Sequence, residues 1–224
     1  MCGRFEIHST LEIIARIFQV GAAGFVLKPG FNIAPGGDVA IVINDGTRRI
    51  VSSRWGFVPS WSKETARTCP INVRAETAAT NAAFRESFEG MRCLVVADGF
   101  YEWKKAGATK NPYYIHQRSG GPFGFAGLYS RRITPHGETM HTCAIITTAA
   151  NELISPIHDR MPVIEEPAYY DQWLDPRIRD RKMIEGLLHP VPADTLEVYP
   201  VTPKMNSAGY DTPENILPLP VSSA

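Results

Sequence analysis

The feature that constrains the fold most is a series of short strand-like runs without a regular alternation of strand and helix. Apolar, aromatic and β-branched residues predict strands at residues 93–97, 113–117, 123–128, 142–148 and 196–201. Two further runs, 39–44 and 49–54, flank Asp45-Gly46, which predicts a β-hairpin. Because strands dominate and no repeating strand-helix-strand unit is present, the pattern favours an α+β fold.

Helices are predicted between these strands. Ser9 and Glu12 fit a capping box at the start of a helix over residues 10–20. Periodicity and helix-forming residues predict further helices at 77–88, 167–174 and 178–188. Seven prolines follow from Pro190 onward, so the C-terminal part is expected to be extended.

The chain is expected to form one domain. No internal repeat or linker divides the 224 residues, and we place the core at 2–206 and a proline-rich tail at 207–224. No apolar run is long enough to span a membrane, and the N-terminus lacks the apolar stretch of a signal peptide. The four cysteines show no paired spacing. We therefore expect reduced thiols, no membrane association and a cytoplasmic, monomeric protein.

The charge is balanced overall but uneven along the chain. Twenty-three Lys and Arg offset twenty-three Asp and Glu, which argues against a polyanion-binding protein that relies on bulk charge. Residues 48–118, however, hold twelve basic and six acidic residues, a net of +6. Sixteen of the basic residues are Arg, whose planar fork suits phosphate. Either an anion-binding face or an ordinary solvated surface would account for this stretch.

Cys2 is the first candidate for chemistry. Removal of Met1, which is efficient before a small residue such as Cys, would leave Cys2 with both a free α-amine and a thiol. The α-amine has an ordinary pKa near 8, and the thiol is intrinsically a strong nucleophile. An aldehyde could form a Schiff base with the amine, and the thiol could then close a thiazolidine ring. The alternative is that Cys2 has no functional role.

Three internal stretches offer supporting groups. Asn72 and Arg74 lie two residues apart, so their side chains share a face if the segment is extended. On that face the Asn amide could orient a substrate and the Arg could clamp a phosphate. Glu102 lies between aromatic residues after a buried strand, where desolvation would raise its pKa toward the range useful for proton transfer. Trp103 could stack on a base, and His158 could act as an acid or base. Each of these residues has a structural alternative. The Asn could lie in a loop, the Glu could face solvent, the Trp could serve packing and the His could be structural.

Together these stretches occur in a distinctive order. The motifs are Met-Cys-Gly-Arg-Phe at 1–5, Phe-Asn-Ile-Ala-Pro at 31–35, Arg-Trp-Gly-Phe-Val-Pro-Ser-Trp at 54–61, Asn-Val-Arg-Ala-Glu-Thr at 72–77, Gly-Phe-Tyr-Glu-Trp at 99–103 and His-Asp-Arg-Met-Pro at 158–162. The chain thereby resembles the SOS-response-associated peptidase (SRAP) family, the abasic-site-processing proteins, from Cys2 to about Asn206. Residues 209–213 follow the closing motif of the family only loosely.

The resemblance implies a curved, largely antiparallel, barrel-like β core with short peripheral helices. It implies binding to single-stranded DNA with an abasic site and a thiazolidine crosslink to the sugar. In this interpretation Cys2 is the nucleophile, Asn72 positions it, Glu102 moves protons and His158 assists ring opening and reversal. The DNA-binding candidates are Arg4, Arg74, Arg160, Trp55, Trp61, Trp103, Thr147 and Thr148.

No metal or cofactor is predicted, because no metal-ligand spacing and no phosphate-binding loop occurs in the chain. Two other functions stay open. Cys2, His158 and Asn72 also resemble the Cys-His-Asn set of a thiol peptidase, acting on its own N-terminus or on other proteins. A module that binds single-stranded DNA without chemistry is the third hypothesis.

Overall fold

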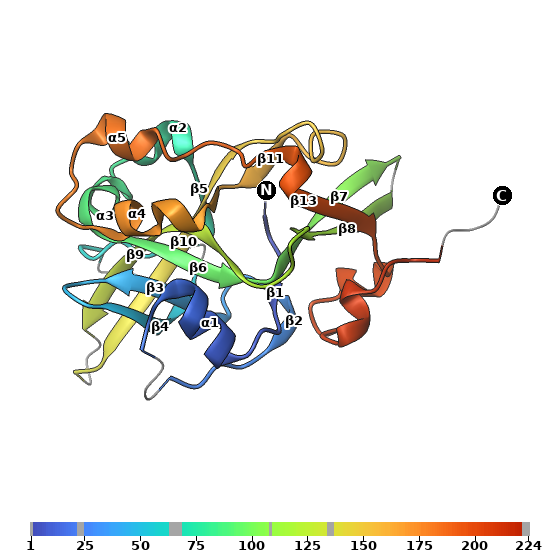
Figure 1. Cartoon of the computed structure of the whole chain (residues 1–224), viewed down its shortest axis with the longest axis horizontal. Coiled ribbons are helices and arrows are strands. Elements are labelled where there is room, and N and C mark those ends of the chain that lie inside the picture. The colour runs from blue at the N-terminus through green and yellow to red at the C-terminus, as the bar shows by residue number, and fades with distance from the viewer. Residues whose placement is uncertain (1, 22–24, 63–68, 108, 134–136, 221–224) are drawn as a thin grey trace.

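The computed structural model describes residues 2–21, 25–62, 69–107, 109–133 and 137–220, which form two β-sheets with short helices around them (Figure 1). The strands are β1 (Phe5–Ile7), β2 (Gly30–Ile33), β3 (Asp38–Asn44), β4 (Arg48–Trp55), β5 (Asn72–Arg74), β6 (Arg92–Ala97), β7 (Gly99–Ala106), β8 (Thr109–Gln117), β9 (Phe123–Ile133), β10 (Thr139–Ala149), β11 (Arg160–Pro162), β12 (Ile164–Glu165) and β13 (Leu196–Pro200). The helices are α1 (Leu11–Phe18), α2 (Ala75–Ala78), α3 (Arg85–Gly90), α4 (Tyr170–Leu174) and α5 (Arg181–Glu185). Short 3-10 turns are η1 (Pro167–Tyr169), η2 (Ala193–Thr195), η3 (Pro203–Asn206) and η4 (Pro213–Ile216).

Five strands of the larger sheet close into a barrel. Their order is β10, β4, β3, β6 and β9, and β9 pairs again with β10. Neighbouring strands are antiparallel except that β10 runs parallel to β4 and to β5. The predicted α+β architecture with a largely antiparallel, barrel-like core is therefore confirmed.

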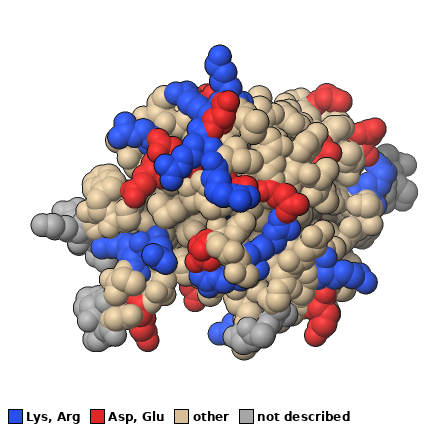
Figure 2. All heavy atoms as spheres, turned by 60° about the vertical axis from the view of Figure 1, so that its left-hand side comes forward, with Lys and Arg blue, Asp and Glu red and all other residues tan. Residues whose placement is uncertain are grey.

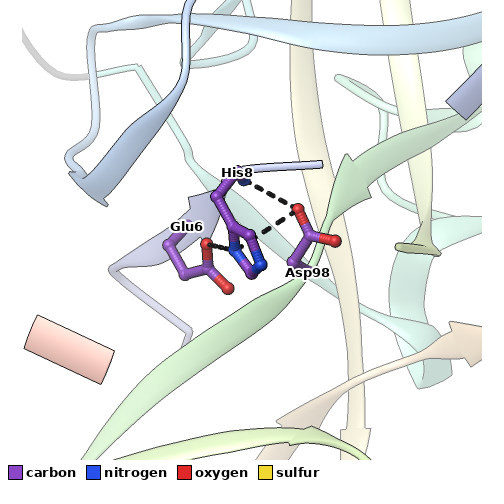
Figure 3. A group of neighbouring side chains, drawn as sticks. All are labelled: Glu6, His8 and Asp98. Carbon is purple, nitrogen blue, oxygen red and sulfur yellow. Dashed lines mark hydrogen bonds and ion pairs between the residues drawn. The ribbon is translucent and has the colours of Figure 1, made fainter. Parts of the chain in front are cut away.

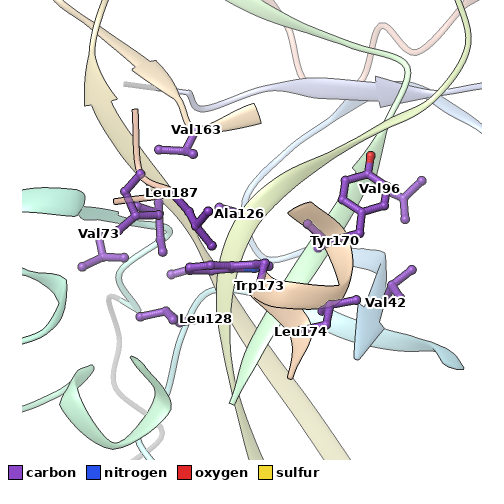
Figure 4. Close-up of a cluster of buried hydrophobic side chains, with 14 of the residues drawn as sticks. Val42, Val73, Val96, Ala126, Leu128, Val163, Tyr170, Trp173, Leu174 and Leu187 are labelled. Carbon is purple, nitrogen blue, oxygen red and sulfur yellow. The ribbon is translucent and has the colours of Figure 1, made fainter. Parts of the chain in front are cut away.

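The apolar run in β6 is continuous because both of its faces are buried. Leu94 and Val96 pack on the side covered by the helices, whereas Cys93 and Val95 belong to the second apolar cluster on the opposite face. Figure 4 shows the helix-covered cluster, in which the ring of Trp173 from α4 lies among apolar side chains of the sheet. A strand covered on one face only would have alternated apolar and polar residues.

The second sheet has the order β13, β8, β7, β1 and β2, and all of its pairs are antiparallel. β1 lies between β7 and β2, with Phe5 opposite both Phe100 and Ile33. The ring of Phe5 contacts Trp55, at 5.0 Å between centroids, and Phe125, at 5.9 Å. The N-terminal strand thus joins the second sheet to the barrel.

The strand predictions are confirmed, and most strands are longer than the sequence pattern indicated. The hairpin of β3 and β4 closes with Asn44 opposite Arg48, and Gly46 adopts a φ of 114° that favours glycine. The predicted strand at residues 196–201 is β13, which pairs with β8. The C-terminal part also packs on the sheet, since the Asp211 carboxylate accepts from the backbone N–H of Phe31. The boundary at residue 206 stays a prediction.

The prediction for the first helix needs correction at both of its ends. The residue that caps α1 is Thr10, whose hydroxyl accepts from Ile13 N–H at 3.5 Å, while the hydroxyl of Ser9 donates to Asp98. The helix ends at Phe18, before the predicted end at residue 20, because the next residue, Gln19, adopts the left-handed region with a φ of 53°.

The single helix predicted at 77–88 is wrong. The structure has the two short helices α2 and α3, with a turn between them. The turn forms because the Asn81 side chain accepts from the backbone N–H of Ala83 at 2.9 Å, which competes with continuation of the helix. The helix predicted at 167–174 is formed by η1 and α4, and the one at 178–188 is reduced to α5.

Cys2, Cys69, Cys93 and Cys143 form no disulfide among the described residues. Within the described ranges, none of the helices is both long and apolar enough to cross a bilayer.

Arg92 ties two helices to the barrel. Its guanidinium is 2% exposed and donates to five backbone carbonyls, at distances of 2.5 to 3.0 Å. These carbonyls belong to Phe88, Glu89, Trp173, Asp175 and Ile178, at or just beyond the C-terminal ends of α3 and α4. A cation at helix C-termini satisfies carbonyls that have no partner within the helix. Burial lowers the pKa of Arg92 to about 10, so the group stays charged at neutral pH.

Replacement of Arg92 should therefore destabilise the whole domain. Arg92→Met leaves several buried carbonyls without a donor, and we expect a loss of about 3 kcal/mol or more in the free energy of unfolding. Arg92→Lys should lose less stability than Arg92→Met, because an ammonium can still donate to as many as three of the five carbonyls. Denaturant unfolding checks this, with Arg85→Met on the exposed side of α3 as the matched control. Equal midpoints for Arg92→Met and Arg85→Met would contradict this role.

A second buried ionisable residue, Glu165, lies in β12 opposite Gly124 of β9. It is 2% exposed, and its Oε1 has no hydrogen-bond partner in the described part of the chain. Burial, with a smaller contribution from Glu166, raises the pKa of Glu165 to about 8. The carboxyl is therefore mostly protonated in the folded protein at neutral pH.

This carboxyl should make the protein less stable as the pH rises. Between about pH 4.5 and 8 the folded state retains a proton that the unfolded state releases, so stability falls by at most about 1.4 kcal/mol per pH unit. Glu165→Gln removes this contribution and should gain stability relative to the parent as the pH rises to about 8. Thermal midpoints of both proteins across this range test it, and parallel pH profiles would contradict it.

Candidate active site

The N-terminal segment places Cys2 inside the molecule. The backbone N–H of Tyr101 donates to the carbonyl of Arg4 at 3.0 Å, which extends the pairing of β1 with β7 toward the N-terminus. Cys2 is fully buried in the apolar cluster that contains Phe5. Asn72 Nδ2 donates to the Cys2 carbonyl at 2.7 Å, and this bond orients residue 2.

Asn72 is held by the barrel. It is the first residue of β5, which runs parallel to β10 with Asn72 opposite Ile145. Its Oδ1 is buried and has no hydrogen-bond partner among the described residues. The amide can therefore orient Cys2 through one atom and accept from a substrate hydroxyl through the other.

A pocket of about 500 Å³ opens next to Gly3. Its lining residues come from the N-terminal segment, the β7–β8 hairpin, the loop before β11 and η3: Gly3, Arg4, Glu102, Trp103, Lys105, Lys110, His158 and Asn206. β1 and the residue before it pair with β7 only as far as Tyr101, so that edge of β7 has no strand partner beyond this point in the described chain. Side chains from both faces of β7 therefore reach the pocket.

Burial controls the protonation of the two central groups. It raises the pKa of the Cys2 thiol far above its usual range, and the nearby Glu102 carboxylate adds to the effect. Burial also raises the pKa of Glu102, which is 2% exposed, while the charge of His158 lowers it. The thiol is thus neutral in this site, and a proton acceptor is needed before it can attack.

The Nδ1 atom of His158 lies close to polar groups of the two residues that follow it. Its Nδ1 accepts from the backbone N–H of Arg160 at 2.9 Å, which in the neutral ring leaves the proton on Nε2. The same nitrogen lies 3.1 Å from the Arg160 carbonyl and 3.1 Å from Asp159 Oδ1, either of which could accept from a protonated ring.

Hydrogen bonds of Arg4, Asn32 and Trp103 position the other walls of the pocket. Arg4 Nη1 donates to Asn32 Oδ1 at 2.9 Å, and Asn32 Nδ2 donates to backbone carbonyls of residues 205, 207 and 210. Trp103 Nε1 donates to Asn206 Oδ1 at 2.6 Å. Arg4 and Trp103, both predicted to bind DNA, therefore lie in the pocket with part of each side chain accessible.

Two predicted DNA-binding residues are in the core. Trp55 is fully buried, packs on Phe5 and donates from Nε1 to the Ile71 carbonyl at 2.9 Å. Thr147 is also fully buried, and its hydroxyl donates to the Val73 carbonyl. Both side chains point into the core of this structure, which therefore does not support a direct contact of either one with a nucleotide. Residue type alone did not show that these two positions are buried.

Arg160 is engaged by the protein itself. Its guanidinium forms a two-bond ion pair with Glu76, at 2.6 and 3.0 Å, and donates to the Thr147 carbonyl at 2.6 Å. The side chain is 13% exposed. In this structure Arg160 therefore connects β11 to α2, and a phosphate would have to displace Glu76 to bind it.

The remaining DNA-binding candidates lie outside the pocket. Arg74 is exposed at the end of β5, and Trp61 is 65% exposed. Thr148 is 7% exposed and lines a separate shallow hollow with Glu76 and Arg181. Their roles stay predictions.

The basic stretch at 48–118 is only partly available to an anion. Arg92 is buried, and Arg48 and Arg49 form ion pairs with Asp171 and Asp45. On the face that Figure 2 shows, Lys and Arg lie intermixed with Asp and Glu and do not form a continuous basic surface. A count of charges along the sequence therefore overestimates the anion-binding face.

Three pocket residues, Lys105, Lys110 and Asn206, were not predicted from the sequence, and neither was a role for Asn32. The two lysines could have been found from the hairpin, because residues two apart on a strand share a face and Lys105 follows Trp103 at this spacing. Asn206 in the pocket and Asn32 behind Arg4 carry no such signal, because only the folded chain brings them to these places.

A second group of ionisable side chains lies where β1 meets β7 and consists of Glu6, His8 and Asp98 (Figure 3). Glu6 bonds to the Tyr114 hydroxyl at 2.5 Å and to His8 Nδ1 at 2.9 Å. Asp98 accepts from the backbone N–H groups of His8 and Ser9, both at 2.8 Å. These contacts occupy the ligand atoms and make the group a structural network; the absence of a metal stays a prediction.

Residues 1–208 match the model of a family described as SOS response associated peptidase (SRAP). The chain is 40% identical over 223 residues to the abasic site processing protein YoqW of Bacillus subtilis, an alignment that covers 96% of this chain and 99% of the relative. It is 30% identical over 228 residues to the abasic site processing protein YedK of Escherichia coli, covering 98% and 100%. The protein HMCES of Gallus gallus is 30% identical over 230 residues, covering 86% and 67%.

Solved structures show the same fold. A protein from Bacteroides thetaiotaomicron superposes with a TM-score of 0.86 at 24% identity, covering 97% of this chain and all of the other. A phage-related protein from Bordetella bronchiseptica superposes with a TM-score of 0.71 at 29% identity, covering 89% and 94%.

Proposed function

Because this chain belongs to the SOS response associated peptidase (SRAP) family, we propose that it binds single-stranded DNA with an abasic site and links Cys2 covalently to the sugar aldehyde. Relatives at 30 to 40% identity over nearly the whole chain are named abasic site processing proteins. The observation that carries the proposal is that Glu102 and His158 line a pocket with basic side chains, directly beside the buried Cys2 that Asn72 holds.

The reaction begins once Met1 has been removed and Cys2 carries the α-amine. The amine nitrogen adds to the aldehyde carbon of the ring-opened sugar and forms a carbinolamine. Protonated Glu102 donates to the hydroxyl, which leaves as water, and an iminium and a carboxylate remain. The sulfur then bonds to the same carbon, and the thiol proton returns to Glu102. The products are a thiazolidine and one water, and Glu102 is restored.

The electrostatics of the site support this role of Glu102. Its raised pKa keeps part of the population protonated, as the dehydration step requires. Because the Cys2 thiol is also neutral, the carboxylate formed in the first step serves as the acceptor that the thiol needs. Asn72 is a positioning residue, since it holds the carbonyl of Cys2 at 2.7 Å. His158 would assist ring opening of the sugar and reversal of the link.

Binding of the strand would rest on groups around the pocket. Arg4 would contact a phosphate and Trp103 would stack on a base, because both line the pocket. Arg74 and Trp61 would contribute from the surface beyond it. A cytoplasmic or nucleoid location and a monomeric state complete the proposal.

The peptidase alternative has weaker geometric support. In a Cys-His-Asn set, the Asn orients the His. Here Asn72 bonds to the carbonyl of Cys2, and His158 Nδ1 bonds to the backbone of Arg160. Cleavage of added peptides by the purified protein, lost on Cys2→Ala, would favour this alternative.

Cys2→Ala should abolish the covalent product. Incubation with a single-stranded oligonucleotide carrying an abasic site should give the parent protein a band that survives denaturing electrophoresis, and Cys2→Ala should reduce it to background. Cys69→Ala, which removes a thiol more exposed than that of Cys2, is the matched control and should crosslink normally. Intact mass confirms that Met1 is absent from the reacting species. Equal crosslinking by Cys2→Ala would refute the proposal, and equal salt-reversible affinity for intact and abasic strands without a crosslink would favour a non-catalytic module.

Glu102→Gln should slow crosslinking by roughly 100-fold and change the affinity for DNA little, because the amide keeps the shape but transfers no proton. Single-turnover crosslinking rates and equilibrium binding separate the two effects. Glu89→Gln, an exposed carboxylate on α3, is the control. A Glu102→Gln protein that binds no DNA would instead mark Glu102 as structural.

A further inference from the structure

The β7–β8 hairpin places two lysines directly opposite each other. Lys105 pairs with Lys110 in the strand register, and both side chains are exposed. Like charges in directly opposed positions of an antiparallel pair destabilise it. Neither lysine forms an ion pair with a carboxylate in the part of the chain that the structure describes. The protein thus keeps an unfavourable pair that it does not neutralise.

This lysine pair belongs to the pocket. Both lysines line it together with Arg4, Trp103 and Glu102. Lys105 shares its face of β7 with Trp103, two residues before it, whereas Lys104 points to the other face and lies opposite Asn111. The wall next to Trp103 is therefore basic.

The charges of the pocket favour a ligand with more than one negative charge. Three cationic side chains, Arg4, Lys105 and Lys110, line it, and Glu102 is the single carboxylate among the lining residues of the described chain. Glu102 is buried, so it cannot serve as the partner of two exposed ammonium groups on the hairpin. A phosphodiester backbone supplies successive charges along one line and would relieve the repulsion between the lysines.

We propose that Lys105 and Lys110 form a phosphate subsite that holds the DNA backbone beside the lesion nucleotide, on the hairpin side of the pocket. This subsite rests on the proposed function, since it assumes that a DNA strand occupies the pocket. A lysine ammonium is a flexible point charge and not a fixed fork, so the subsite holds backbone of any sequence. The subsite increases the affinity for the DNA strand and does not take part in bond formation.

Salt dependence of binding tests the subsite. Equilibrium binding of an intact single-stranded oligonucleotide is measured over a range of salt concentrations with the Cys2→Ala protein. Loss of two phosphate contacts should reduce the slope of log affinity against log salt by about 1.4, since each contact on a single strand contributes about 0.7. Lys105→Gln with Lys110→Gln is the test variant, and Lys104→Gln on the opposite face is the matched control, with a change below about 0.3. An unchanged slope in the double variant, or an equal change in the control, overturns the proposal.

Crosslinking by proteins that retain Cys2 supplies the second measurement. The double lysine variant should need several-fold more abasic oligonucleotide for half-maximal rate at low salt, with the same rate at saturation. A fall in the saturating rate with unchanged half-saturation would overturn the subsite, because the lysines would then act on the chemistry. If the parent protein forms no crosslink at all, the proposed function fails, and the salt slopes still decide the subsite independently.

The free protein offers a third readout. With the repulsion removed, Lys105→Gln should unfold at a slightly higher temperature than the parent at low salt, and the difference should vanish at high salt. A lower midpoint at every salt concentration would show that Lys105 is held by stabilising contacts and would contradict an unneutralised pair.

Discussion

The pairing of β1 between β7 and β2 is the interaction on which the rest of the site depends. It is only three residues long, yet Phe5 packs against Trp55 and Phe125 of the barrel and makes the strand part of the core. Because β1 begins at Phe5, Cys2 must lie within a few residues of the barrel wall. Burial of this segment also raises the pKa of the Cys2 thiol, so the same packing positions the thiol and keeps it protonated.

Buried polar groups carry much of the structural organisation, and the protein satisfies most of them with backbone atoms. Arg92 is surrounded by five carbonyls, and Asn32 binds three carbonyls and the guanidinium of Arg4. Such groups hold loops and helix ends in one arrangement, because each alternative would leave a buried donor or acceptor unpaired. Burial has another effect on Glu102 and Glu165: it raises the pKa of both carboxyls. At Glu102 the raised pKa suits proton transfer in the pocket, whereas at Glu165, which does not line the pocket, it makes stability depend on pH.

Local patterns predicted the strands and the hairpin because side-chain alternation and turn chemistry are encoded by neighbours in sequence. The same patterns failed at residues 77–88, where the Asn81 side chain forms a turn inside a helix-like stretch. They also did not show that Trp55 and Thr147, whose residue types suit DNA, are fully buried in the folded chain. For Arg160, the residue type was compatible with a phosphate ligand, but its partner Glu76 is 84 residues away in sequence.

The sequence alone determined the chemical groups: a cysteine at position 2, an amide at Asn72, a carboxyl at Glu102 and an imidazole at His158. Their motif order also identified the family. Only the tertiary structure decided which groups lie in or beside one pocket, because Cys2, Asn72, Glu102 and His158 come from four separate segments. It also decided their protonation, since a pKa shift depends on burial and on neighbouring charge, and neither is a property of the residue type.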